Sequence, residues 1–246
     1  MLNFIRSLFR RDPPPTIAQD YHRILSEYSL YYRRLNSDMQ KRFRFRIYKL
    51  LNTISFAGGQ GIRHVSREMR TVIACAIVEI TFGLDRYLPE QFRTIIVMPR
   101  RYLYPGYGQP FLGHVDSRAR LVYFSWEDVR QGYLVPDDAV NVALHEMAHV
   151  LEHENAYQGI YGKFFRTTDW QQWGKLAFEK MKMIRAGQHE FLKSYGGVNM
   201  GEMFAVCVET FFEQPTEFEA QLPELYHHMS LLLGQDPLRE GNPLLS

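Results

Sequence analysis

Apolar side chains recur at helical spacing in the first third of the chain. Between residues 16 and 35, Tyr21, Ile24, Leu25 and Tyr28 follow one another in the pattern of a helix with one buried face. The same period predicts a second helix over residues 39–56, after a capping segment at 36–38. A third helix is predicted over residues 66–82, with Gly83 at its C-terminal end. The chain should therefore begin with a group of three helices.

The pattern then changes to that of strands. Residues 94–98 form a β-branched run that ends at Pro99, which predicts a buried strand. Two further strands are predicted over residues 111–115 and 119–126, after a loop rich in glycine and proline. The alternation in 119–126 fits two roles, a core strand or a sheet edge on which an extended peptide pairs.

From residue 137 onward the pattern is helical again. Asp137 and Asp138 are expected to cap a helix over 139–153, and further helices are predicted over 168–186, 199–212 and 223–233. Helices and strands are grouped rather than alternating, so a doubly wound parallel sheet is excluded. We expect an α+β, mainly helical fold with a small mixed sheet. Residues 16–246 should form a single domain, after an N-terminal arm (1–15) that ends in a proline-rich break.

The composition of the chain limits the classes of protein to which it can belong. The chain has 246 residues, 29 of them basic and 27 acidic, and no run of eighteen apolar residues. This pattern predicts no transmembrane segment and gives no charge bias towards direct nucleic-acid binding. Cys75 and Cys207 lie in apolar stretches, so buried, reduced thiols are expected, with one disulfide as the alternative.

The N-terminal arm indicates in which cellular compartment the protein is expected. Its basic residues follow its apolar ones, which is the reverse of a secretory signal, so a cytoplasmic protein is expected. The helical spacing of its apolar residues also fits a segment that lies on a membrane surface. Docking of the arm on its own domain, or disorder, is the favoured alternative.

The helix predicted over 139–153 carries the clearest chemical motif, His145-Glu-Met-Ala-His149. Two histidines four positions apart differ by about 40° around a helix, so both imidazoles leave the same face. This spacing suits two nitrogen ligands of one zinc ion. Glu146 is rotated by about 100° and can reach a metal-bound water without binding the metal, which suits a general base.

A catalytic zinc needs a third protein ligand. Glu152 and Asn155 occupy the positions where a metzincin has glycine and histidine, so that class is excluded. Glu202 and Glu209 lie seven residues apart in an apolar helix, which places both on one face. One of them can bind the metal, while the other can accept a hydrogen bond from a metal-binding histidine and so orient it. Spacing alone does not decide between them.

These segments together resemble the Mlc titration factor A (MtfA) family, the glucose-regulated metallopeptidases related to the anthrax lethal factor catalytic core. The resemblance rests on three motifs and on Tyr195: His145-Glu-Met-Ala-His-Val-Leu-Glu152, Glu202-Met-Phe-Ala-Val-Cys-Val-Glu-Thr-Phe-Phe212 and Gln235-Asp-Pro-Leu238. The family usually has aspartate at the position of Glu152.

The resemblance implies a role for each residue. It implies a zincin-like fold of the gluzincin type, in which His145, His149 and Glu202 bind Zn²⁺. It also implies that Glu146 is the catalytic glutamate and that Tyr195 donates a hydrogen bond to the oxyanion. The expected function is zinc-dependent hydrolysis of peptide bonds, with aminopeptidase-like activity on small substrates.

Two other functions remain as alternatives. The family resemblance also implies a regulatory binding protein that sequesters a transcriptional repressor of sugar uptake and has little peptidase activity. The second alternative is a protein that keeps the zinc-binding fold but has no catalytic activity. The presence of Glu146 argues against it.

Overall fold

The structure is a computed structural model that describes residues 13–157, 163–188 and 191–245. Most of the predicted arm lies outside these residues, and the first described helix, α2 (Pro15–Tyr28), starts at the last of the three prolines. Proline suits this position because the first helical residue needs no N–H partner. The division into an arm and a single domain remains a prediction.

The N-terminal helices differ from the predicted ones at their ends. The helix predicted over 16–35 is divided into α2 and α3 (Leu30–Arg34), because Ser29 is extended and its side chain accepts the N–H of Tyr32. The second helix, α4 (Ser37–Leu51), is capped by Asn36 and ends earlier than predicted. The third, α5 (Arg67–Ile80), is nearly as predicted, although Thr81 rather than Gly83 caps it.

Four strands form one mixed sheet in the order β1-β2-β4-β3. Strand β1 (Ser55–Gly58) pairs parallel with β2 (Thr94–Met98), which pairs parallel with β4 (Leu121–Ser125). Strand β3 (Gly113–Asp116) pairs antiparallel with β4. Strand β4 is thus an inner strand, and its predicted role as a peptide-pairing edge is wrong because both of its sides are already hydrogen-bonded. The edge next to β4 is β3.

The remaining helices follow the sheet. Their bounds are α6 (Trp126–Leu134), α7 (Val142–Ala156), α8 (Thr167–Arg185), the short 3₁₀ helix η1 (Ser194–Gly197), α9 (Met200–Glu213), α10 (Pro215–Gln221) and α11 (Pro223–Leu233). Helix α7 begins later than predicted, because Ala139 has a left-handed backbone and Asn141, rather than Asp137 or Asp138, caps the helix. The predicted mainly helical α+β fold with a small mixed sheet is confirmed.

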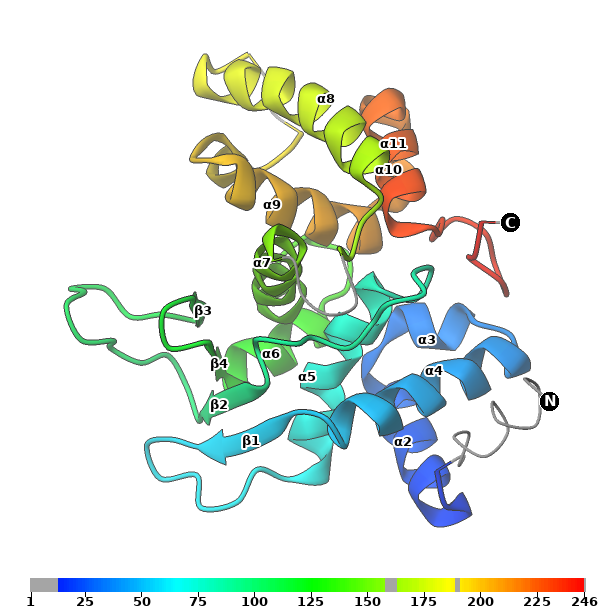
Figure 1. The fold of residues 1–246 in the computed structure, drawn as a ribbon, viewed down its shortest axis with the longest axis vertical. Helices are drawn as coiled ribbons and strands as arrows, with labels where there is room; N and C mark the ends of the chain where they lie inside the picture. Colours follow the sequence, from blue (N-terminus) through cyan, green and yellow to red (C-terminus); the bar gives the residue numbers. More distant parts are fainter. Residues whose placement is uncertain (1–12, 158–162, 189–190, 246) are drawn as a thin grey trace.

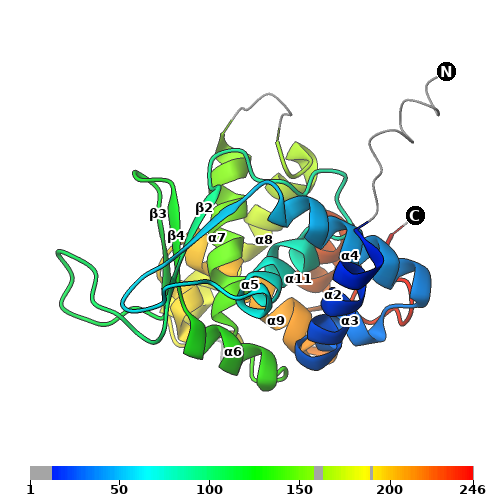
Figure 2. The ribbon, with the colours of Figure 1, turned by 90° about the horizontal axis from the view of Figure 1, so that it is seen from below.

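Helix α7 lies at the centre of the molecule (Figure 1). The sheet covers one of its sides, helices α2–α5 lie on another, and α8–α11 form the opposite layer (Figures 1 and 2). Helix α9 packs directly against α7, and β3 packs against it from the sheet. Side chains of α7 that point between β3 and α9 therefore have a neighbouring element on either side.

The two cysteines are free and buried, as predicted. Cys75 lies in α5 and Cys207 in α9. Of the helices in the described ranges, none is both long enough and apolar enough to cross a membrane.

Candidate metal centre

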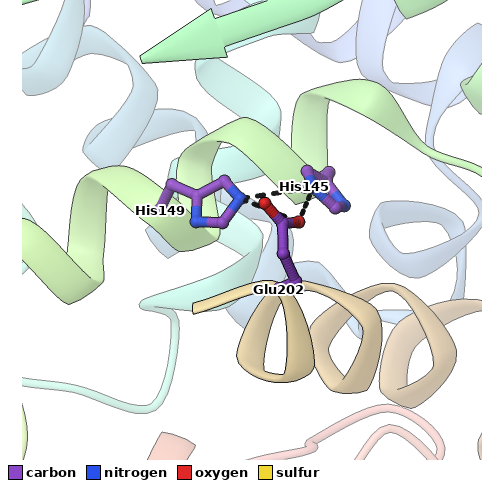
Figure 3. Close-up of side chains that lie close together, drawn as sticks. All are labelled: His145, His149 and Glu202. Carbon is purple, nitrogen blue, oxygen red and sulfur yellow. Dashed lines mark hydrogen bonds and ion pairs between the residues drawn. The ribbon is translucent and has the colours of Figure 1, made fainter. Parts of the chain in front are cut away.

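Helix α7 presents two histidines to α9. Asn141 caps α7 by accepting the N–H groups of Ala143 and Leu144, which fixes where the helix starts and which face each later residue occupies. His145 and His149 then lie one turn apart on the same face. Figure 3 shows both imidazoles pointing towards the carboxylate of Glu202, which comes from the first turn of α9.

The three side chains converge on one point. Oε2 of Glu202 lies 3.1 Å from Nε2 of His145 and 3.4 Å from Nε2 of His149, and the two Nε2 atoms are 3.3 Å apart. Zinc bonds of about 2.0–2.1 Å in a tetrahedral site place neighbouring ligand atoms about 3.3 Å apart. The donor set and its spacing therefore fit a metal ion. Within the described residues, this is the one group of three such side chains.

The electrostatics of the cluster favour positive charge between these atoms. Burial lowers the pKa of His145, but hydrogen bonds with Glu202 and Glu209 outweigh it and raise the pKa to about 10. Burial raises the pKa of Glu202, but the two histidines hold it at about 2. The carboxylates thus stabilise cationic charge at the point where the ligand atoms meet, which is what a divalent cation requires.

Glu209 holds the other nitrogen of His145. Its Oε1 accepts a hydrogen bond from Nδ1 of His145, and its Oε2 accepts the backbone N–H of Asn141 at 3.1 Å. A protonated Nδ1 leaves the lone pair on Nε2 free for a metal. The structure therefore separates the two glutamates that spacing left open: Glu202 faces the Nε2 atoms of both histidines, and Glu209 lies behind His145.

Glu152 has a similar position behind His149. Its Oε2 lies 3.7 Å from Nδ1 of His149, and it packs closely on Gly201, where a Cβ would be 2.6 Å from the same oxygen. Glu152, whose side chain is longer than the aspartate usual at this position in the MtfA family, thus reaches from α7 to the start of α9. His153, one turn further along α7, packs at a tilt beside Phe92 and is not among the three converging side chains.

Glu146 lies next to the cluster on the side of the sheet. It is only 7% exposed, and burial raises its pKa to about 7. Gly113 of β3 packs on it so closely that a Cβ there would be 2.7 Å from Cγ of Glu146. No pattern in the sequence pointed to Gly113, since its role depends on how β3 packs on α7.

Tyr195 lies on the open side of the cluster. It belongs to η1, is 53% exposed, and its ring centre is 6.0 Å from that of His145. Burial and the charge of Glu202 raise the pKa of its hydroxyl, so the group stays protonated and can donate a hydrogen bond. Tyr195 is thus near the cluster, while its catalytic role remains a prediction.

A cavity of about 640 Å³ opens onto these residues. Its walls come from the 104–118 segment, α7, η1 and the start of α9, and they include His145, Glu146, His149, Tyr195 and Glu202. A substrate in this cavity reaches the histidine pair, the buried carboxyl and the tyrosine hydroxyl together. This combination can bind a metal, hold a water and accept a proton.

Comparison with known proteins agrees with this geometry. The sequence pattern of the glucose-regulated metallopeptidases M90 matches residues 6–232. The chain belongs to this family. The M90 assignment establishes a metallopeptidase family and implies a metal ion. An uncharacterized protein of Synechocystis sp. is 24% identical to this chain over an alignment of 248 positions, which covers 95% of this chain and 88% of that protein.

Proposed function

We propose that this M90 chain hydrolyses peptide bonds with one zinc ion held by His145, His149 and Glu202. The observation that carries the proposal is the convergence of two imidazole nitrogens and one carboxylate oxygen, 3.1–3.4 Å apart, beside the buried carboxyl of Glu146. Two histidines and a glutamate are a ligand set of catalytic zinc, which leaves a coordination position for water or substrate.

When bound, the metal polarises the scissile carbonyl and lowers the pKa of a water molecule. Glu146 accepts a proton from that water as the water oxygen adds to the carbonyl carbon. It then donates the proton to the leaving nitrogen as the C–N bond breaks. A pKa raised by burial suits a group that must both take and give a proton near neutral pH.

Tyr195 is proposed to stabilise the oxyanion. Its protonated hydroxyl lines the same cavity as the cluster, and a donor in that place strengthens its hydrogen bond as negative charge develops on the carbonyl oxygen. Glu209 and Glu152 act through the histidines, which they keep in the orientation that directs Nε2 to the metal.

The general-base role can be tested with Glu146→Gln. The variant should keep one zinc per chain and lose turnover by about 10²–10⁴-fold, because only the proton acceptor is removed. Hydrolysis of a peptide library and metal content are measured on both proteins. A loss smaller than tenfold with full metal content would contradict the mechanism.

Aminopeptidase-like activity and the gluzincin type rest on the resemblance to the MtfA family. A transcriptional repressor as partner rests on the same resemblance, and neither the fold nor the cluster adds support for it.

A further inference from the structure

The turn that carries Tyr195 is too short to fix its own position. The 3₁₀ helix η1 lies between α8 and α9 along the chain, and both helices pack on it. Two backbone hydrogen bonds close the turn, from the N–H of Gly196 to the carbonyl of Lys193 at 3.0 Å and from the N–H of Val198 to the carbonyl of Tyr195 at 3.1 Å. A single turn of this kind is not stable alone, so contacts from neighbouring elements must hold it.

Arg185 holds the end of this turn. It is the last residue of α8, and its guanidinium donates from Nε to the carbonyl of Gly197 at 2.5 Å and from Nη2 to the carbonyl of Val198 at 2.9 Å. Gly197 also packs on α8 so closely that a Cβ there would lie 2.9 Å from Cγ2 of Ile184. Two donors on one rigid, charged plane fix both the distance and the angle between the elements that they join. The end of α8 is therefore bound to the end of η1.

The contact reaches Tyr195 through one backbone hydrogen bond. Val198, whose carbonyl accepts from Arg185, donates its own N–H to the carbonyl of Tyr195. At the start of the turn, Nζ of Lys193 donates to the carbonyl of Ala139, in the segment that precedes α7. The backbone of Tyr195 is thus held on one side from α8 and on the other from the start of α7.

Tyr195 depends on these backbone contacts because its side chain is 53% exposed, so protein packing covers only part of it. A displacement of about 1 Å at a reacting group can lower a rate by about 10²-fold. Glu202 is fixed in another way, since Asn199 caps α9 by accepting the N–H of Glu202 at 2.9 Å and α9 packs along α7. Loss of the Arg185 contacts should therefore displace Tyr195 more than the metal ligands.

We propose that Arg185 is a positioning residue that keeps the hydroxyl of Tyr195 at the place where the oxyanion forms. Arg185 does not line the 640 Å³ cavity, so it acts through the turn and not on the substrate. The inference rests on the proposed function, because it requires the hydrogen bond of Tyr195 to the oxyanion.

The test compares variants of the full chain loaded with zinc, on a peptide that the wild type hydrolyses. Arg185→Met should lower kcat by about 10–30-fold and leave KM, zinc content and the circular dichroism spectrum close to those of the wild type. Arg185→Lys can still donate to one of the two carbonyls and should recover part of the loss. Lys182→Met is the matched control and should keep the wild-type kcat, because Lys182 lies in the same last turn of α8 and pairs with the exposed Glu179 at 2.8 Å.

A double-mutant cycle with Tyr195→Phe separates positioning from a general effect on the fold. In the Tyr195→Phe background, Arg185→Met should lower kcat by less than about twofold, because no hydroxyl is left to position. An equal loss in both backgrounds, or a wild-type kcat of Arg185→Met, would overturn the inference and leave the proposed function standing, provided that Tyr195→Phe alone lowers kcat. A wild-type kcat of Tyr195→Phe would overturn both the proposed oxyanion role and the inference.

Discussion

Gly113 and Glu146 are in direct contact, and the contact leaves no room for a side chain on the glycine. A Cβ at Gly113 would lie 2.7 Å from Cγ and 3.1 Å from Oε1 of Glu146. The edge strand of the sheet therefore sets the position of the proposed general base. This contact links the edge strand β3 to the carboxyl that is proposed to transfer protons.

Gly113→Ala should therefore lower kcat by about 10–100-fold, because the Glu146 carboxyl must move away from its position. Zinc binding should be unaffected, since the added methyl group contacts Glu146 and Val142 rather than His145 or His149. Gly174→Ala is the matched control, because a Cβ there has open space around it. Steady-state kinetics and zinc content decide the prediction, and equal kcat in the two variants would contradict it.

Glu209→Gln should weaken zinc binding by about 10–100-fold. Glu209 accepts hydrogen bonds from both His145 and the backbone of Asn141, whereas the single oxygen of glutamine cannot serve both as a carboxylate does. The control is Glu213→Gln, since Glu213 accepts from the side chain of Asn141 at 3.0 Å. Competition with a chelator gives the zinc Kd, and the same Kd in both variants would show that Glu209 does not support the ligand.

Tyr195→Phe should lower kcat by about 10²–10³-fold and leave KM and zinc affinity close to those of the wild type. Only one oxygen is removed, and its interaction is strongest in the transition state. Tyr107→Phe, at another exposed tyrosine of the same cavity, is the control. An unchanged kcat would remove Tyr195 from the mechanism, and loss of the metal would make it a ligand.

Glu79 should make the stability of the protein depend on pH. Burial in α5 raises the pKa of this carboxyl from 4.5 to about 8, although Cys75 and Ser29 act in the opposite direction. Between pH 4.5 and pH 8, Glu79 keeps its proton in the folded chain but has lost it in the unfolded chain. The contribution of protonated Glu79 to the stability is therefore complete below about pH 4.5 and is lost as the pH rises towards 8.

The free energy of unfolding of the wild type relative to Glu79→Gln should therefore fall between pH 5 and pH 8, by at most about 1.4 kcal/mol for each pH unit. Glu213, whose pKa is raised to about 8 mainly by burial and least by the charge of Glu79, is present in both proteins, so most of its contribution cancels in the comparison. Urea denaturation at three pH values measures the difference, and a constant difference would contradict the buried, protonated state of Glu79.

Local signals explain which elements could be predicted from the sequence. Strand β2 was predicted with its observed bounds, because a β-branched run and a proline define it. Strand β1 was missed, since most of its residues are exposed and its one partner strand follows about forty residues later. Helix α6 was not predicted, although Ser125 and Asp128, three positions apart, form a capping pair at its start.

The candidate site divides in the same way. The spacing of His145 and His149 is a local property of one helix, so the sequence predicts that both imidazoles share a face. Whether Glu202 or Glu209 faces both histidines depends on how far α9 is shifted along α7. The spacing of residues within α9 does not determine this shift. Only the family resemblance favoured Glu202 before the structure placed it opposite both histidines.

The central claim is that His145, His149 and Glu202 together hold one zinc ion, and its most direct test is the zinc retained after gel filtration. Wild type and Glu146→Gln should each retain about one zinc per chain, while His145→Ala, His149→Ala and Glu202→Ala should retain almost none, because two remaining protein ligands hold zinc poorly. Circular dichroism shows whether each variant is folded. Full zinc content in folded histidine and Glu202 variants would contradict the claim.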